Sequence, residues 1–160
     1  MLTVDFLHQV LSYDKETGKF TWKVSRGNVS AGTAAGVIAE GRISIRVNGK
    51  IYRANRLAWF YVTGEWPNGE VDHIDGDSLN DKWTNLRDVS RQVNQQNQRK
   101  PLIRNESGLL GVSQNKHTGK FTARVSVNSQ IHWLGTYETP GLAHAAYIQG
   151  KRDLHEGCTL

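Results

Sequence analysis

The sequence predicts an α+β protein built from two small modules, and three observations lead to this fold class. Apolar and polar residues alternate within 42–53 and 121–137, where tight-turn signals separate antiparallel strands. Several short segments between and after these strands carry apolar residues at helical spacing. A polar stretch around Pro101 divides the chain into an N-terminal and a C-terminal part. A chain of 160 residues can bury the core of one domain or of two small ones.

The chain is expected to begin with a helix over residues 3–12. Thr3 can cap this helix, and apolar residues follow it at helical spacing. A turn over 13–18 then leads into a short strand that ends at Trp22. The glycine-rich stretch 27–41 is expected to be a loop.

A β-hairpin is expected over 42–53. The residues alternate on both sides of Asn48-Gly49, the dipeptide that favours a type I′ turn. A short helix over 55–62 is expected to end at Gly64, with a proline three residues further on.

The middle of the chain has the order strand, loop, strand, helix. The strands are expected at 71–75 and 86–89, and Ser90 is expected to cap the helix. A polar linker with Pro101 is expected within 98–107.

The C-terminal module is expected to contain three strands and one helix. The strands are placed at 109–113, 121–127 and 131–137, and Thr139 caps an alanine-rich helix. Three antiparallel strands under one helix bury one face of their sheet and leave the other face exposed.

Composition excludes several classes of protein. The longest apolar run, 57–62, is far shorter than the roughly 20 residues that span a bilayer. The first residues lack the basic and apolar regions of a secretory signal. The single cysteine, Cys158, excludes an internal disulfide and every multi-cysteine zinc module. A soluble protein of a reducing compartment is therefore expected, with no membrane association and no zinc.

Positive charge is concentrated near the middle of the chain. The net charge is +5 and the sequence pI about 9.5. Between 85 and 104 five basic residues oppose Asp88 alone: Arg87, Arg91, Arg99, Lys100 and Arg104. Such a stretch attracts polyanions. It is equally compatible with a solvated helix face followed by a charged linker.

One group of polar residues carries a chemical signal. Asp72-His73 ends a predicted strand, Asn85 follows twelve residues after His73, and Asn94 comes nine residues later. A carboxylate and an amide oxygen are hard ligands that suit Mg²⁺. A neighbouring imidazole can deprotonate water near neutral pH, and an asparagine can fix its tautomer.

These residues resemble a known motif. The stretch 71–77, the sequence Asn85-Leu86-Arg87 and the stretch 94–97 resemble the HNH endonucleases of the His-Asn-Asn subtype, which are common among phage homing endonucleases. Two upstream segments, 13–18 and 56–67, look like those that precede the motif in that family. The resemblance covers roughly residues 10–98.

The resemblance implies a ββα-metal fold and assigns roles to four residues. His73 would be the general base that activates water against a phosphodiester, and Asn85 would brace the loop and orient His73. Asp72 and Asn94 would hold one Mg²⁺ that stabilises charge in the transition state. Mn²⁺ is also compatible with two oxygen ligands and water.

Other interpretations compete at individual positions. His73 by itself could be an ordinary buried histidine. Asn80 is an alternative to Asn85, and Asn97 is an alternative to Asn94. Two acids in the loop, Asp75 and Asp77, lack the spacing of a calcium-binding EF-hand and favour a turn.

A second resemblance covers about residues 107–157. Four segments resemble the AP2 DNA-binding domain, which in phages is often attached to HNH nucleases: 108–112, 119–125, 133–137 and 143–147. Members of that family place the exposed face of the sheet in the major groove, where arginine and tryptophan contact bases and phosphates.

The match to the AP2 family is incomplete. Several arginine positions of the family are occupied by other residues, such as Leu110, Ser113 and Asn115. Candidate DNA contacts in this module are Lys120, Arg124, Trp133 and Thr136, alongside Arg87, Arg91, Arg99 and Lys100 upstream. Trp133 could instead pack within the sheet. The departures put direct base readout in doubt.

Together these resemblances predict an HNH endonuclease domain over 1–98, with a ββα-metal core at about 69–98. A linker over 99–106 and an AP2-like domain over 107–160 would follow. The predicted activity is Mg²⁺-dependent hydrolysis of double-stranded DNA, without a small-molecule cofactor. The expected setting is the cytoplasm of a bacterial host, if the protein is phage-encoded.

Two other functions remain compatible with the sequence: a non-catalytic DNA-binding protein derived from a homing endonuclease, and a nuclease for RNA or structured nucleic acid. A monomer of the predicted enzyme would nick one strand, whereas a dimer could cut both. The sequence is compatible with either state.

Overall fold

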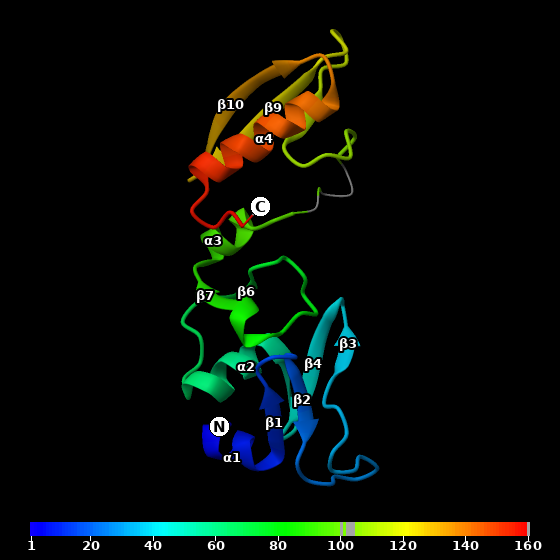
Figure 1. Cartoon of the computed structure of the whole chain (residues 1–160), viewed down its shortest axis with the longest axis vertical. Coiled ribbons are helices and arrows are strands. Elements are labelled where there is room, and N and C mark those ends of the chain that lie inside the picture. The colour runs from blue at the N-terminus through cyan, green and yellow to red at the C-terminus, as the bar shows by residue number, and fades with distance from the viewer. Residues whose placement is uncertain (100, 102–104, 160) are drawn as a thin grey trace. The chain divides into compact units, whose positions relative to one another are not determined.

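The computed structural model describes residues 1–99, 101 and 105–159, and its chain divides into two compact units, Met1–Arg91 and Gln92–Leu160 (Figure 1). The helices within the described residues are α1 Val4–Val10, α2 Ala54–Thr63, the 3₁₀ turn η1 Trp83–Asn85, α3 Arg91–Gln96 and α4 Pro140–Leu154. The strands within the described residues are β1 Leu11–Asp14, β2 Lys19–Trp22, β3 Val37–Ala39, β4 Arg42–Val47, β5 Lys50–Arg53, β6 Glu70–His73, β7 Leu86–Val89, β8 Val112–Gln114, β9 Phe121–Val127 and β10 Gln130–Tyr137. This is the mixed α and β composition, with small antiparallel sheets, that the sequence predicts.

The first helix is shorter than predicted. Thr3 caps α1 as expected, because its hydroxyl accepts a hydrogen bond from the Phe6 N–H at 3.3 Å. The helix ends at Val10, and Leu11 instead begins β1, where it pairs with Trp22 of β2. Leu11 is fully buried in the core, so the tertiary contact outweighs the helical spacing that extends through residue 11.

The predicted hairpin at 42–53 forms as β4 and β5. Asn48 and Gly49 have φ values of 48° and 77°, the left-handed pair that a type I′ turn requires. A third strand, β3, pairs with the other edge of β4, although the glycine-rich stretch 27–41 predicts a loop there. Three residues between turns are too short to show a periodic pattern.

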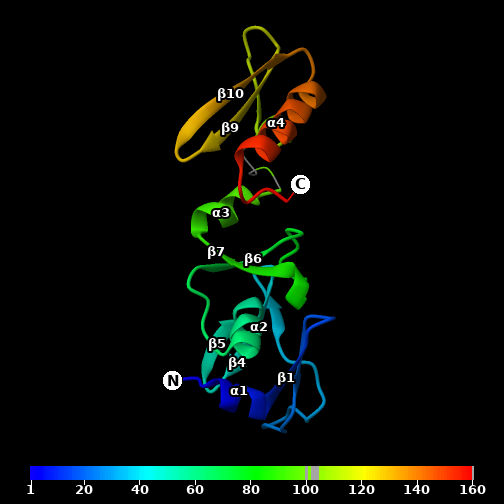
Figure 2. The same ribbon diagram turned by 60° about the vertical axis from the view of Figure 1, so that its left-hand side comes forward.

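Helix α2 covers the inner face of this sheet (Figure 2). Leu57 and Ala58 are fully buried in one core with Ile45 and Val47 of β4. The helix ends at Gly64, which has φ 79° and donates its N–H to the Phe60 carbonyl at 3.0 Å. The same core includes residues of α1, β1 and β2, so these elements form one body.

The predicted order of strand, loop, strand and helix appears as β6, a loop with η1, β7 and α3. β6 and β7 are antiparallel, and Asp72 lies opposite Arg87 while His73 lies opposite Leu86. Helix α3 begins directly after Ser90. The second compact unit begins at Gln92, so it includes all of α3 except Arg91.

The second unit contains a three-stranded antiparallel sheet in the order β10-β9-β8. Helix α4 packs on one face through Ala143 and Tyr147, which share a core with Ala123 and Val125 of β9. Thr139 caps α4 by accepting the Leu142 N–H at 3.3 Å, as predicted.

The first strand of this sheet lies later than predicted. It begins at Val112, because Gly111 occupies a left-handed turn with φ 74°. A Cβ atom at Gly111 would lie 1.9 Å from the Tyr147 ring, so only glycine allows this approach of β8 to α4.

Candidate active site

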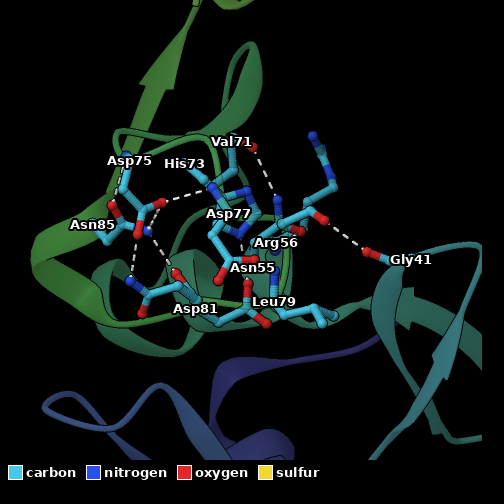
Figure 3. Close-up of polar contacts among 12 residues, drawn as sticks. Gly41, Asn55, Arg56, Val71, His73, Asp75, Asp77, Leu79, Asp81 and Asn85 are labelled. Carbon is cyan, nitrogen blue, oxygen red and sulfur yellow. Dashed lines mark hydrogen bonds and ion pairs between the residues drawn. The ribbon is translucent and has the colours of Figure 1, made fainter. Parts of the chain in front are cut away.

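Strand β6 carries Asp72 and His73, and helix α2 holds the strand in place. The Asn55 side-chain amide donates a hydrogen bond to the Val71 carbonyl at 2.9 Å (Figure 3). The Arg56 guanidinium donates to the Gly69 carbonyl at 3.1 Å. Asn55, Val71 and both site residues are buried. The main chain that carries the histidine is therefore held by the packed core of the unit.

His73 pairs with a carboxylate that the sequence analysis does not single out. Its Nε2 lies 2.8 Å from Oδ1 of Asp81, and both side chains are buried. A carboxylate can only accept here, so Nε2 carries the proton and the lone pair of a neutral ring is on Nδ1. The contact with the carboxylate therefore favours one tautomer of the neutral ring.

The main chain of Asp81 is tied to the β1–β2 hairpin. The Tyr13 hydroxyl donates to the Asp81 carbonyl at 2.5 Å. Burial, followed by the charges of Asp81 and Asp14, raises the pKa of Tyr13 above its usual value, so the hydroxyl stays a donor. In the described part of the chain, Oδ2 of Asp81 is buried without a hydrogen-bond partner.

Asn85 holds the loop between β6 and β7 together. Its Oδ1 accepts the Asp75 N–H at 3.0 Å, and its Nδ2 donates to Oδ1 of Asp75 at 2.9 Å and to the Asn80 carbonyl at 2.7 Å. Asn80 contributes to the same network through a 2.6 Å bond to the other Asp75 oxygen. The two asparagines considered for this role thus meet on one carboxylate, and Asn85 both accepts and donates.

Asp75 is the acceptor at the centre of this loop. Burial raises the pKa of Asp75, but hydrogen bonds from the Asn80 side chain, the Asp77 N–H and the Asn85 side chain outweigh it. The pKa of Asp75 therefore lies below its usual value. The predicted turn role of Asp75 and Asp77 agrees with these contacts, because Asp77 accepts the Leu79 N–H at 3.0 Å.

Asp72 contacts its cross-strand neighbour. Arg87 donates from Nε and Nη2 to Oδ2 of Asp72 at 2.9 and 2.8 Å. Asp72 is buried, and the guanidinium compensates its charge. Arg87, predicted as a DNA contact, therefore also has a structural role next to the candidate metal ligand.

Three further predicted site residues, Arg91, Asn94 and Arg99, lie in α3 or shortly after it in the chain. Asn94 is half-buried on α3, and Arg91 is exposed at its start. The alternative residue Asn97 is buried and accepts a hydrogen bond from the Thr159 hydroxyl at 2.5 Å. Arg99 donates to the Thr159 carbonyl at 2.9 Å, while Lys100 lies outside the described residues.

The candidate DNA contacts of the second unit lie on its sheet. Arg124 and Trp133 are cross-strand partners on β9 and β10, and Trp133 is 67% exposed. Trp133 therefore does not pack in the core of this module, which was the competing interpretation. Thr136 is exposed on β10, and Lys120 pairs with Glu138 at 2.6 Å.

No group of three or more His, Cys, Asp or Glu side chains in the described residues could hold a metal ion. The predicted donors are one carboxylate and one amide, Asp72 and Asn94, and such a pair does not form a cluster of that kind. None of the described helices has the length and apolar character of a membrane-spanning segment.

Comparison with known proteins identifies the region that contains these residues. The model of a family described as HNH endonuclease matches residues 52–96, which include Asp72, His73, Asp81 and Asn85. Protein 3.8 of Escherichia phage T7 is 34% identical over 111 residues, which cover 66% of this chain and 89% of that protein.

The chain belongs to the family of phage T7 Protein 3.8 and carries an HNH endonuclease domain. The match to the HNH domain begins in β5 and ends with α3. It contains α2, which supports the site, as well as β6 and β7, which form it. The family indicates a nuclease acting on DNA.

Sequence reasoning missed Asp81, although a signal for it exists. It is an acidic residue eight positions after His73, inside the polar loop between the two strands. The neighbouring Asn80 is an alternative to Asn85 as the middle asparagine of the motif. The contact with His73 depends on the path of the loop, which the residue types do not define.

Proposed function

We propose that this protein is a DNA endonuclease in which His73 is the general base. The buried pair of His73 and Asp81, within the HNH domain, is the observation that supports this role. It places an imidazole with a defined tautomer at the end of a rigid strand. A buried histidine with only a packing role could satisfy its ring nitrogens without a buried carboxylate. Here the carboxylate is Asp81, whose Oδ2 has no hydrogen-bond partner within the described residues.

In the proposed reaction Nδ1 of His73 takes a proton from water, and the water oxygen attacks the phosphorus of a phosphodiester. The bond from phosphorus to the 3′ oxygen breaks, and the leaving 3′ oxygen keeps the bonding electrons and takes a proton from solvent water, which gives 5′-phosphate and 3′-hydroxyl ends. Asp81 keeps the proton on Nε2 and stabilises the imidazolium that forms. Asn85 keeps the loop closed around this pair through Asp75.

We further propose Asp72 and Asn94 as ligands of Mg²⁺, with Mn²⁺ as a second candidate. The donor chemistry fits, because carboxylate and amide oxygens are hard ligands and two of them leave positions for water and phosphate. The ion would stabilise negative charge on the phosphate during the reaction. Arg87 orients the Asp72 carboxylate through its Oδ2.

The second unit is proposed to bind double-stranded DNA in the manner of an AP2-like domain. Its sheet is covered by α4 on one face, and the other face presents Arg124 next to the exposed Trp133. A cation beside an exposed aromatic ring suits phosphate and base contacts. This module would supply affinity, while the HNH domain supplies the chemistry.

The proposal is tested by plasmid cleavage with purified wild-type protein and the His73→Ala variant, each with Mg²⁺ and with EDTA. We expect wild type with Mg²⁺ to convert supercoiled plasmid to open circles, and His73→Ala to lose at least about 100-fold in rate. His8→Ala, which removes a histidine from α1, is the matched control and should keep the wild-type rate.

If His73→Ala cleaved the plasmid at the wild-type rate, the assignment of His73 as the general base would be overturned. Binding without cleavage by the wild type on plasmid, host and phage DNA would favour the non-catalytic DNA-binding protein. Linear product at the earliest times would indicate paired cuts by a dimer, whereas open circles alone would indicate a nicking monomer.

A further inference from the structure

The segment 17–53 carries more positive charge than the chain as a whole. It contains seven basic residues and a single acid, Glu40, for a net charge of +6. The whole chain has a net charge of +5. The segment includes β2 to β5, and none of the residues assigned to the HNH site or to the second unit lies in it.

Strand register places three of these basic residues on one face of the β3–β4–β5 sheet. Directly opposite residues share a face, and Arg46 lies opposite Ile51 while Ser44 lies opposite Arg53. Arg42 lies opposite Ala39 on the same face. The alternate residues of β4, such as Ile45 and Val47, point into the core under α2. We call the side with the arginines the outer face.

The outer face forms an open groove of about 450 Å³, lined by Val37, Ala39, Glu40, Ser44, Arg46, Ile51 and Arg53. Val37 and Ile51 are 69% and 61% exposed, although they lie on strands. Exposed apolar side chains between arginines are typical of surfaces that contact both the phosphates and the sugars or bases of nucleic acid.

Internal hydrogen bonds hold two of these arginines in place. Arg53 donates to the Ala39 carbonyl at 3.0 Å and to the Ser44 hydroxyl at 2.9 Å, and it pairs with Glu40 at 2.6 Å. Arg46 donates to the Gly49 carbonyl at 3.3 Å. Less side-chain entropy is lost when such ordered guanidinium groups bind a phosphate.

The outer face is also connected to the active-site loop. The Ser78 hydroxyl donates a hydrogen bond to the carbonyl of Gly41, in the turn between β3 and β4, at 2.7 Å (Figure 3). Ser78 lies between Asp77 and Leu79 in the loop that Asn85 closes. This contact places the turn between β3 and β4 beside the loop that follows His73.

We propose that the outer face of the β3–β4–β5 sheet is a DNA-binding surface that contacts the phosphate backbone of the same duplex that the HNH site cleaves. This inference rests on the proposed function for its substrate. Its physical basis is the charge of the segment, the alignment of Arg42, Arg46 and Arg53 on one face, and the tether through Ser78.

The test measures binding of full-length protein to a short duplex in EDTA, so that cleavage plays no part. The variants are Arg42→Gln/Arg46→Gln, its charge-retaining partner Arg42→Lys/Arg46→Lys, and Lys15→Gln. Lys15 is exposed in the β1–β2 turn, outside the β3–β4–β5 sheet, and controls for a general loss of charge. Affinity is measured at several salt concentrations between about 50 and 200 mM.

Affinity falls as salt rises, and each lost phosphate contact makes the plot of log affinity against log salt less steep by about 0.9. The double glutamine variant should therefore have a slope that is less steep than that of wild type by about 1.8. The double lysine variant should retain most of the slope, and Lys15→Gln should retain all of it. Thermal unfolding of each variant should match wild type, because both arginines are exposed.

A wild-type slope and affinity for Arg42→Gln/Arg46→Gln would overturn the proposed surface, and so would an equal fall in Lys15→Gln. These outcomes are independent of the plasmid assay. If wild type cleaves and the double variant binds normally, the surface is refuted while the nuclease stands. If the slope falls but wild type cleaves no DNA, the surface stands and the nuclease is refuted.

Discussion

Asp81 and His73 are eight positions apart in the sequence but lie in direct contact, with both side chains removed from solvent. A carboxylate on one ring nitrogen decides which nitrogen is basic, so the effect of Asp81 on the proposed reaction passes through His73 alone. Asp81 is 2% exposed, which makes contact with a DNA duplex impossible. It is a positioning residue in the proposed mechanism.

Asp81→Asn should therefore lower kcat without changing KM for DNA. The amide can donate toward Nε2 and favour the other tautomer, and the loss should be about 10²–10⁴-fold, the usual contribution of general base catalysis. Steady-state cleavage of a labelled duplex measures both constants. Asp77→Asn changes a carboxylate in the same loop that faces solvent and should keep kcat within about twofold of wild type. Equal losses in both variants would assign the effect to the loop as a whole.

The lowered pKa of Asp75 makes the stability of the loop dependent on pH. A carboxylate with a folded-state pKa below the unfolded value of about 3.9 stabilises the fold above that value. This contribution is lost as the pH falls through the folded-state pKa. Asp75→Asn should thus unfold at lower urea than wild type at pH 7, and the difference should shrink below about pH 4. A gap that stays constant from neutral pH to about pH 3 would contradict the shift. Asp5→Asn changes an exposed carboxylate on α1 and is the control.

At the scale of elements, the β1–β2 hairpin packs against the loop between β6 and β7 and supports it. Its turn approaches the loop so closely that a Cβ atom on Gly18 would lie 2.4 Å from the main-chain carbon of Asp81. The Tyr13 hydroxyl bonds the carbonyl of that same residue, and Trp83 donates its N–H to the Lys15 carbonyl at 3.0 Å. The hairpin thus contributes to the position of Asp81 without carrying any residue of the proposed chemistry.

Gly18→Ala should lower both stability and cleavage. The left-handed φ of 72° alone costs about 1–2 kcal/mol for a residue with a Cβ atom, and the contact with Asp81 adds a shift of the loop. Gly64→Ala has a similar φ of 79° with open space around its Cβ, so it should lose stability but keep its cleavage rate. Urea unfolding and plasmid cleavage measure the two effects. Equal cleavage by both variants would exclude a role for the hairpin in placing Asp81.

For the whole molecule, the proposed division of labour separates binding from chemistry. The two compact units have separate cores, and the sheet of the second unit exposes Arg124 and Trp133 on the face away from α4. If this face binds the duplex, its residues should change affinity while the chemical step at His73 proceeds as before.

Trp133→Ala should weaken binding of a duplex by about 10-fold, equivalent to about 1.4 kcal/mol, while the rate at saturating DNA stays at the wild-type value. Leu142→Ala removes an exposed apolar side chain from α4, on the other side of the sheet, and should leave affinity unchanged. Fluorescence anisotropy and single-turnover cleavage measure the two quantities. A loss of rate at saturation in Trp133→Ala would show that the second unit also takes part in the chemical step.

The sequence by itself was sufficient for features that depend on nearest neighbours. Asn48-Gly49 determines its turn because only residues tolerant of a left-handed backbone allow it. Thr3 and Thr139 cap the helices that follow them, because a cap depends on three or four consecutive residues. Asp72 and His73 were identifiable because they are adjacent in the chain.

The tertiary structure decided the features that join distant segments. Whether Leu11 ends a helix or begins a strand depended on Trp22 and on burial in the core. The partner of His73 depended on the path of a twelve-residue loop, which Tyr13, Gly18 and Asn85 hold in shape. The basic residues of 17–53 are visible in the sequence, but only the register of β3, β4 and β5 places three arginines on one face. Residue types define local conformation, whereas contacts between segments depend on the folded core that brings them together.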